Sequence, residues 1–272
     1  MGPTNRYQNA DYLRGDQYKN SRNLGDRAQL HHRFSTNPVN WLNWIFPFLD
    51  LQSQSNVLEC GSGPGWLWRN NLDRIPDECC ITVTDLSPGM VDEAKESLAS
   101  SDHDFRFQET DIANLPFEDD SFDVVVANHM LYHVPDRNKA LSETQRVLKP
   151  NGLLVATTVG KDHMHELREL ARQLAPELEN SFKQANITFT LENGRAQLEP
   201  WFASVELHYY ESNLKVTEVE PILAYVLSSS EVRASVDEQS IQSATLELER
   251  MIFERGTFNI STNSGLFRAR SN

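Results

Sequence analysis

Residues 56–65 read NVLECGSGPG, a short apolar run that ends in three closely spaced glycines. The run 57–60 is typical of a buried strand, and the residues after Gly65 have helical spacing. Glycine lets the backbone turn sharply and approach a ligand without a Cβ in the way, and a helix N-terminus offers free N–H groups. The stretch predicts a strand, a ligand-binding turn and a helix. A tight turn that binds nothing is the alternative.

A carboxylate at the end of the next strand favours a nucleoside ligand. Residues 81–85 read ITVTD, and Asp85 lies twenty positions beyond Gly65. In a doubly wound sheet, an acidic side chain at this place reaches the ribose hydroxyls of a ligand held over the first loop. A loop or capping carboxylate is the alternative interpretation of Asp85.

The spacing of the glycines discriminates between nucleoside ligands. Gly61, Gly63 and Gly65 form G-x-G-x-G, whereas a dinucleotide fingerprint needs a third glycine at position 66, which is Trp66. The loop also contains no lysine that could cradle a phosphate. An NAD-dependent oxidoreductase is therefore the weaker alternative.

Strands and helices alternate through the middle of the chain, which predicts an α/β fold with a mostly parallel, doubly wound sheet. We expect further strands at 105–108, 122–127, 153–159 and 202–210, and helices at 65–74, 88–100, 136–148 and 164–185. Residues 1–50 are expected to form a helical arm or lid, with a helix at 24–34 and a second one capped by Asn37. In the remaining domain, 51–272, residues 214–255 are expected to form a helical insertion before a hairpin at 257–270.

Bulk composition narrows the function classes. The chain has 272 residues and a net charge of −14, which disfavours a nucleic-acid substrate. Residues 1–20 contain no apolar run, so we expect no signal peptide, and no run approaches the ~18–20 apolar residues of a membrane span. Three cysteines, two of them adjacent, fit neither a disulfide framework nor a zinc site. We expect a cytoplasmic protein without a metal.

Five motifs in fixed order resemble those of class I S-adenosylmethionine (SAM)-dependent methyltransferases. They run from about residue 56 to 160, and the sequence is most similar to the branch that contains ubiquinone and menaquinone biosynthesis enzymes. The motifs are the loop 59–65, TDLSPGM at 84–90, TDIANLPF at 110–117, SFDVV at 121–125 and RVLKPNG at 146–152. The resemblance implies a seven-stranded sheet with a helical N-terminal lid, SAM as cofactor, and methyl transfer to a small molecule.

The resemblance also implies roles for single residues. Glu59 and the loop backbone, including Ser62, would hold the methionine part of SAM, and Asp85 would hold the ribose hydroxyls. The other cofactor positions carried over are Leu86 and Met90 beside the adenine, Asp111 and the Ile112 N–H on its polar edge, and Asn128 near the sulfonium. Carboxylates suit hydroxyl and amino donors, and apolar side chains suit an adenine ring.

Histidines after the fourth predicted strand are candidates for the chemistry. A base is needed only when the acceptor must lose a proton, and histidine suits that role near neutral pH. We expect His133 to be the first candidate and His129 the second; packing or a backbone hydrogen bond is the alternative for either. The flanking segments supply the candidate substrate contacts Tyr18, His31, Phe34 and His163.

The sequence leaves the acceptor open, including whether its methylated atom is oxygen, nitrogen or carbon. A SAM-binding regulatory or assembly subunit without catalysis remains a second hypothesis, because the motifs indicate cofactor binding more than catalytic turnover. Oligomeric state is not predicted.

Overall fold

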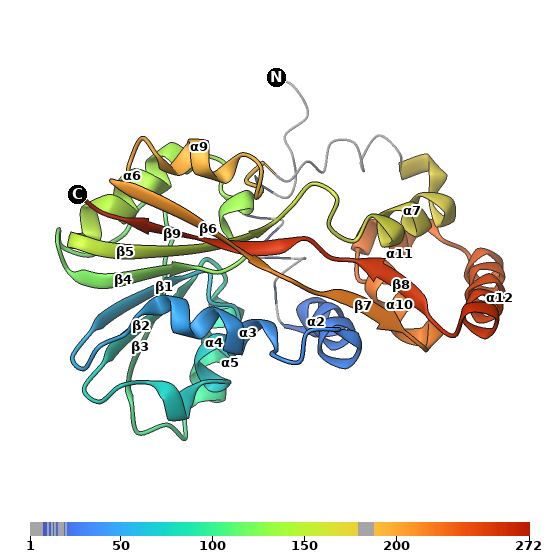
Figure 1. The fold of residues 1–272 in the computed structure, drawn as a ribbon, viewed down its shortest axis with the longest axis horizontal. Helices are drawn as coiled ribbons and strands as arrows, with labels where there is room; N and C mark the ends of the chain where they lie inside the picture. Colours follow the sequence, from blue (N-terminus) through green and yellow to red (C-terminus); the bar gives the residue numbers. More distant parts are fainter. Residues whose placement is uncertain are drawn as a thin grey trace.

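A seven-stranded sheet forms the centre of the structure (Figure 1). The computed structural model describes residues 8, 9, 11, 13, 15, 19, 21–178 and 188–272. The strand order is β3-β2-β1-β4-β5-β9-β6, and only β9 runs antiparallel to its neighbours. The strands are β1 (Asn56–Cys60), β2 (Cys80–Asp85), β3 (Asp104–Glu109), β4 (Phe122–Ala127), β5 (Leu148–Val159), β6 (Ser204–Tyr210) and β9 (Ser264–Arg270). This order confirms the predicted doubly wound, mostly parallel fold.

The central strands are apolar on both faces because helices cover both sides of the sheet. Val125 of β4 faces one core, whereas Val124 and Val126 face the other, and each is at most 4% exposed. A strand buried on both faces has a continuous apolar run instead of an alternating one. The run at 124–126 therefore marks the middle of the sheet.

Helices from different parts of the chain build these two cores. One face is covered by α6 (Arg137–Val147) and α9 (Gly194–Leu198), whose buried residues join the first core. The other face is covered by α3 (Trp41–Ile45), η3 (Phe46–Leu49), α4 (Trp66–Arg69), η4 (Leu72–Arg74) and α5 (Pro88–Leu98). Residues 41–49 thus pack on the main sheet, so that only the part of the N-terminal segment before them can act as a lid.

A cap with its own apolar core extends from the sheet on the side of β5, β6 and β9 (Figure 1). Leu30, Leu214, Ile222 and Ile260 are fully buried in it. The cap consists of α2 (Arg22–Phe34), α7 (His165–Leu174), η6 (Pro176–Leu178), β7 (Asn213–Val216), α10 (Val219–Leu227), α11 (Ser230–Ser235), α12 (Glu238–Arg255) and β8 (Phe258–Ser261). It joins segments that the sequence analysis treated as an N-terminal lid and a C-terminal insertion.

The predicted C-terminal hairpin is wrong. β8 pairs with β7, and β9 lies between β5 and β6, so the two strands do not pair with each other. The expected turn at 262–265 is held by other segments: Thr262 donates its hydroxyl hydrogen to Ser212 O, and Asn263 donates its N–H to His163 Nδ1. The chain therefore continues from the cap into the main sheet.

Four helix predictions also need correction. At 164–185, helix α7 ends at Leu174, since proline at 176 disfavours helix at the residue before it, and residues 179–185 lie outside the described residues. The helix expected at Asn37 begins at Trp41, capped by Asn40, while Asn37 Oδ1 accepts from the Val39 N–H in a local turn. Helix 65–74 is split into α4 and η4. The expected helical region from 214 opens with strand β7, whose alternating burial fits a strand.

None of the helices in the described part of the chain is both long and apolar enough to cross a lipid bilayer.

Buried packing around β9 holds the main sheet against the helices that cover it. Phe267 is fully buried, with its ring 5.8 Å from that of Phe189. Phe267→Ala should lower the free energy of unfolding by about 3–5 kcal/mol, because it leaves a cavity between helices and sheet. Phe253→Ala is the control: Phe253 is 91% exposed, and the change should stay within about 0.5 kcal/mol. Urea denaturation measures both; equal effects would contradict the assigned packing.

Candidate active site

The glycine loop after β1 has a backbone that favours glycine. Gly61, Gly63 and Gly65 have φ values of 68°, 57° and 73°, in the left-handed region. A Cβ at Gly61 would lie 2.8 Å from the Met130 Cβ, and one at Gly63 would lie 3.5 Å from Leu24 Cδ2. The loop is therefore packed between α2 and the segment after β4, and a side chain at Gly61 would clash with Met130.

Asp85 holds this loop in place. Its Oδ2 accepts the Gly63 N–H at 2.9 Å, and its Oδ1 accepts the Ser87 N–H at 2.8 Å. Burial raises the pKa of the carboxyl group, and the backbone hydrogen bonds oppose that rise. Each carboxylate oxygen can accept more than one hydrogen bond, so Asp85 can hold the loop and still bind a hydroxyl.

Glu59 is a buried carboxyl group beneath the same loop. It is 1% exposed, and its Oε2 accepts the Trp68 indole N–H at 2.7 Å. Its Oε1 is buried without a partner in the described part of the chain. Loss of water raises the pKa of Glu59 to about 8, and nearby Asp85 contributes to the rise. An unpartnered buried acceptor suits a ligand ammonium group, which fits the methionine end of SAM. No local sequence pattern indicates the Trp68 contact.

The positions expected around the adenine lie at the ends of β2 and β3. Leu86 is half-buried, whereas Met90 and Ile112 are at most 4% exposed. Asp111 is exposed, and its Oδ1 accepts the Ala113 N–H at 2.9 Å, so that its other oxygen stays open to a donor. These residues occupy the predicted edge of the sheet, and their contacts with a cofactor remain predictions.

A strained backbone follows β4. His129 has a φ of 53°, which is uncommon for a residue with a side chain. Its N–H donates to Thr157 Oγ1 at 2.9 Å, and that hydroxyl donates to Asn128 Oδ1 at 2.7 Å. Thr157 on β5 thus fixes both predicted site residues, a role that depends on strand pairing and that no local pattern signals.

Three histidines from separate segments meet next to this turn. The rings of His31 on α2 and His163 after β5 are parallel within 4°, with centroids 6.0 Å apart. The His129 ring lies 5.0 Å from Trp41. Loss of water lowers the pKa of His31 and of His129 to about 4, and it lowers the pKa of His163 well below its usual value. All three are therefore uncharged at neutral pH.

The other predicted chemistry and substrate residues take different places. His133 lies on η5 (Leu131–His133), with its ring 4.5 Å from that of Tyr132. Phe34 packs against the core of the cap. Tyr18 lies outside the described residues.

Helix α2 spans the distance between the loop and the histidines. Leu24 lies against Gly63, and His31 follows seven residues later, two helical turns along the same face. Seven residues advance a helix by about 10 Å. The helix therefore covers both halves of the candidate site.

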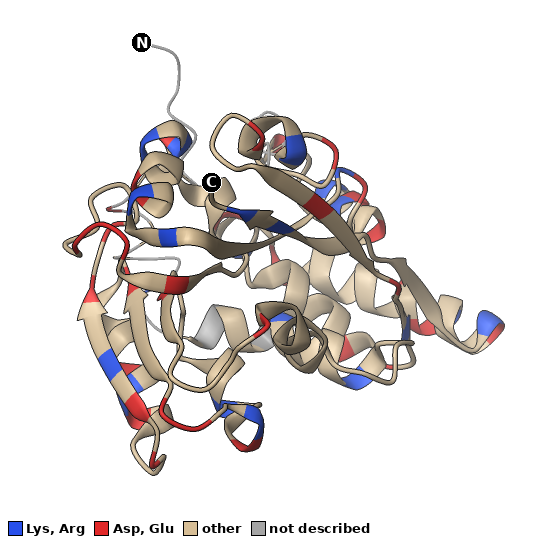
Figure 2. Ribbon diagram, turned by 60° about the vertical axis from the view of Figure 1, so that its left-hand side comes forward, with Lys and Arg blue, Asp and Glu red and all other residues tan. Residues whose placement is uncertain are grey.

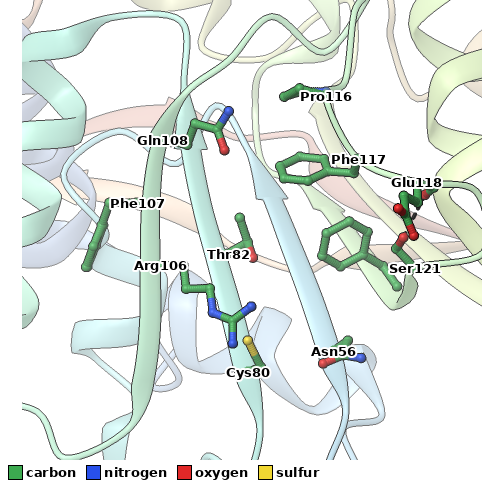
Figure 3. Close-up of a pocket in the computed structure, with 11 residues that line it drawn as sticks. Asn56, Cys80, Thr82, Arg106, Phe107, Gln108, Pro116, Phe117, Glu118 and Ser121 are labelled. Atoms are coloured by element: carbon green, nitrogen blue, oxygen red, sulfur yellow. Dashed lines mark hydrogen bonds between the residues drawn. The ribbon is translucent and has the colours of Figure 1, made fainter.

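Two open grooves lie elsewhere on the described surface. One, of about 520 Å³, is lined by Thr82, Arg106 and Gln108 on β2 and β3 and by Phe117 from the following loop (Figure 3). The other, of about 530 Å³, lies at the amino ends of β1, β4 and β5. Neither groove contains the glycine loop or the histidines, so the candidate site is separate from both grooves.

The described residues carry positive and negative charges in a mixed distribution (Figure 2). In the view of Figure 2, Lys and Arg are scattered among Asp and Glu over the sheet and the cap, with no contiguous basic face. No three His, Cys, Asp or Glu side chains in the described part of the chain are placed to hold a metal ion.

Comparison with known proteins agrees with the motifs. Residues 58–156 match a family described as "Methyltransferase domain". Malonyl-[acyl-carrier protein] O-methyltransferase of Halalkalibacterium halodurans is 28% identical over 171 residues, covering 61% of this chain and 62% of that protein. Demethylmenaquinone methyltransferase of Staphylococcus epidermidis is 33% identical over 118 residues, covering 42% of this chain and 47% of that protein. The chain spans less than two thirds of the length of these relatives.

Solved structures share the fold. Phosphoethanolamine N-methyltransferase 2 of Haemonchus contortus, in complex with phosphomonomethylethanolamine and S-adenosylhomocysteine, has a TM-score of 0.59 at 18% identity; the match covers 97% of this chain and 60% of that one. Residues 58–156 therefore resemble a methyltransferase domain in sequence, and the chain shares its fold with solved methyltransferases. The cap lies outside the matched residues.

The raised pKa of Glu59 makes a testable link to cofactor binding. In the free protein Glu59 holds a proton below pH 8. A ligand ammonium favours the ionised carboxylate, so binding must release that proton. The affinity for SAM should rise with pH from 6 to 8, by up to about tenfold per pH unit, and level off above 8.

Calorimetry across this pH range measures the slope. Glu59→Gln is the matched control, because it keeps an acceptor for Trp68 and cannot ionise; its slope should be flat. The same slope in both proteins would rule out Glu59 as its source.

Proposed function

We propose that this protein transfers a methyl group from SAM to a small-molecule acceptor. One observation carries the proposal: the glycine loop, Asp85 and the unpartnered Glu59 oxygen lie at the carboxyl ends of the strands, directly beside a cluster of histidines under α2. Ligands of open α/β sheets bind at this edge.

The residues present fit the cofactor. Glu59 would bind the methionine ammonium, and Asp85 would bind the ribose hydroxyls. The backbone of Gly61–Gly65, which includes Ser62, would lie along the methionine part of the cofactor. Leu86 and Met90 would lie beside the adenine, Asp111 and Ile112 would bind its polar edge, and Asn128 would face the sulfonium. The cofactor supplies an electrophilic methyl group on a positively charged sulfur.

The chain's own contribution is positioning and exclusion of water. Direct displacement needs alignment of the nucleophile more than acid–base help. Helix α2 covers the loop and the histidines, and Thr157 fixes the turn at Asn128 and His129. These contacts preorganise the place where the acceptor would lie.

His133 is the proposed base for an acceptor that carries a proton. With a pKa of about 4, His129 has little affinity for a proton at neutral pH and is the poorer candidate. On such an acceptor, His133→Ala should lower the rate by about 10²–10⁴-fold without changing SAM affinity. On an acceptor that is already ionised, the loss should be much smaller.

The acceptor is proposed to be a metabolite or a carrier-bound small group, like the compounds in the names of the relatives, and not a nucleic acid. We also propose that the protein acts in the cytoplasm, because Cys60, Cys79 and Cys80 are free thiols. The short glycine spacing disfavours NAD as a ligand, and the complete set of cofactor positions favours an enzyme over a regulatory subunit.

A metabolite screen tests the proposed activity. The protein is incubated with SAM and a metabolite extract, and mass spectrometry should detect a compound that gains one methyl group. Asp85→Asn should weaken SAM binding by about 1–3 kcal/mol and reduce this product, because the ribose hydroxyls lose a charged acceptor.

The matched control is Asp92→Asn on α5, since the Asp92 side chain is 72% exposed and pairs with Lys95 on the same helix. It should bind SAM and form product like the wild type. SAM binding without any methylated product from broad extracts would favour the regulatory alternative, and binding of NAD without SAM would overturn the proposal.

A further inference from the structure

Among the described residues, the histidine cluster beside the glycine loop has no charged partner that would suit a cation. The described groups that influence His31, His129 and His163 electrostatically are other histidines and Arg168, and none of them is a carboxylate. The Arg168 guanidinium donates to Lys161 O and is exposed. The described residues therefore offer a substrate ammonium no counter-charge at these rings.

The cluster is rich in uncharged hydrogen-bond donors. Asn263 N–H donates to His163 Nδ1 at 3.1 Å, so the Nδ1 carries a lone pair and the neutral ring has its hydrogen on Nε2. The Trp41 Nε1–H is buried and has no partner in the described part of the chain. Neutral His31 and His129 each carry one more N–H.

The position of the cluster relative to the loop fits an acceptor subsite. Met130, the residue after His129, packs directly on Gly61, and Leu24 of the helix that carries His31 lies on Gly63. The donors therefore adjoin the end of the loop where the transferring group would lie, on the side of β4 and β5.

We propose that His31, His129, His163 and Trp41 form the acceptor subsite, and that it takes an organic oxyanion, a carboxylate or an ionised enol or phenol. This inference rests on the proposed function. Neutral N–H donors in a poorly hydrated site stabilise an oxyanion, as in an oxyanion hole. They offer an ammonium group no negative charge, and they have too little proton affinity to deprotonate one.

Methyl transfer to an oxyanion needs no proton transfer. A lone pair of the acceptor oxygen forms the O–C bond to the methyl carbon as the C–S bond breaks, and the electron pair of that bond stays on sulfur. The negative oxygen and the positive sulfur both become neutral. Surroundings without charges favour a step that removes two opposite charges.

Three probes of similar shape test the subsite in the full-length protein loaded with S-adenosylhomocysteine. They are benzoate, benzamide and benzylammonium, an anion, its neutral counterpart and a cation. Calorimetry should show benzoate binding at least tenfold more tightly than either of the others. Phenolate from an acidic nitrophenol should bind like benzoate if the site takes any oxyanion; failure of that probe alone would restrict the class to carboxylates.

Variants assign the effect to the proposed donors. Trp41→Phe keeps the ring and removes one N–H, and His163→Phe removes another; each should weaken benzoate about tenfold, since a hydrogen bond to a charged group is lost. His165→Phe is the matched control, because His165 has a 57% exposed side chain outside the cluster. It should leave benzoate affinity unchanged, and all three variants should bind S-adenosylhomocysteine as the wild type does.

The outcomes separate this inference from the proposed function. If S-adenosylhomocysteine binds but benzoate shows no preference over benzylammonium, the oxyanion subsite is wrong and the methyltransferase proposal stands. Unchanged benzoate affinity in both Trp41→Phe and His163→Phe would also contradict the assignment. If S-adenosylhomocysteine does not bind to the wild type, the proposed function itself fails.

Discussion

The structure depends on one carboxylate that holds one backbone loop. Asp85 accepts the N–H of Gly63 and the N–H of Ser87, and so connects the turn after β1 with the turn after β2. The loop itself has left-handed φ angles that a side chain would strain. Because both groups lie at the carboxyl ends of adjacent parallel strands, this single contact fixes the edge of the sheet where a ligand can bind.

The cap completes that edge from two directions. Helix α2 reaches from Gly63 to the histidines, and β6–β7 and β8–β9 carry the chain between the main sheet and the cap (Figure 1). His163 accepts the Asn263 N–H at the junction where β9 begins. The contacts that hold the cap on the sheet therefore also build the proposed acceptor side of the site. Because these contacts surround the histidine rings, the rings stay uncharged.

The sequence predicted the parallel half of the sheet and the glycine loop because their signals are local: apolar runs, glycine spacing and an acidic residue at a strand end. It failed at the C-terminus because the strands around residues 258–270 alternate like a hairpin, while their true partners, β5, β6 and β7, lie far away in the chain. The contacts of Thr157, Trp68 and Trp41 could not be predicted for the same reason. His31 and His163 could be proposed as lining residues, but not as neighbours.

Hydrogen exchange with and without S-adenosylhomocysteine tests the central claim most directly, namely that the cofactor binds between the glycine loop, Asp85 and α2. The ligand should slow amide exchange in residues 61–65 and 85–90 and in α2, and leave the strands that line the groove of Figure 3 unchanged. Slower exchange confined to that groove, or none in the glycine loop and α2 at saturating ligand, would contradict the account.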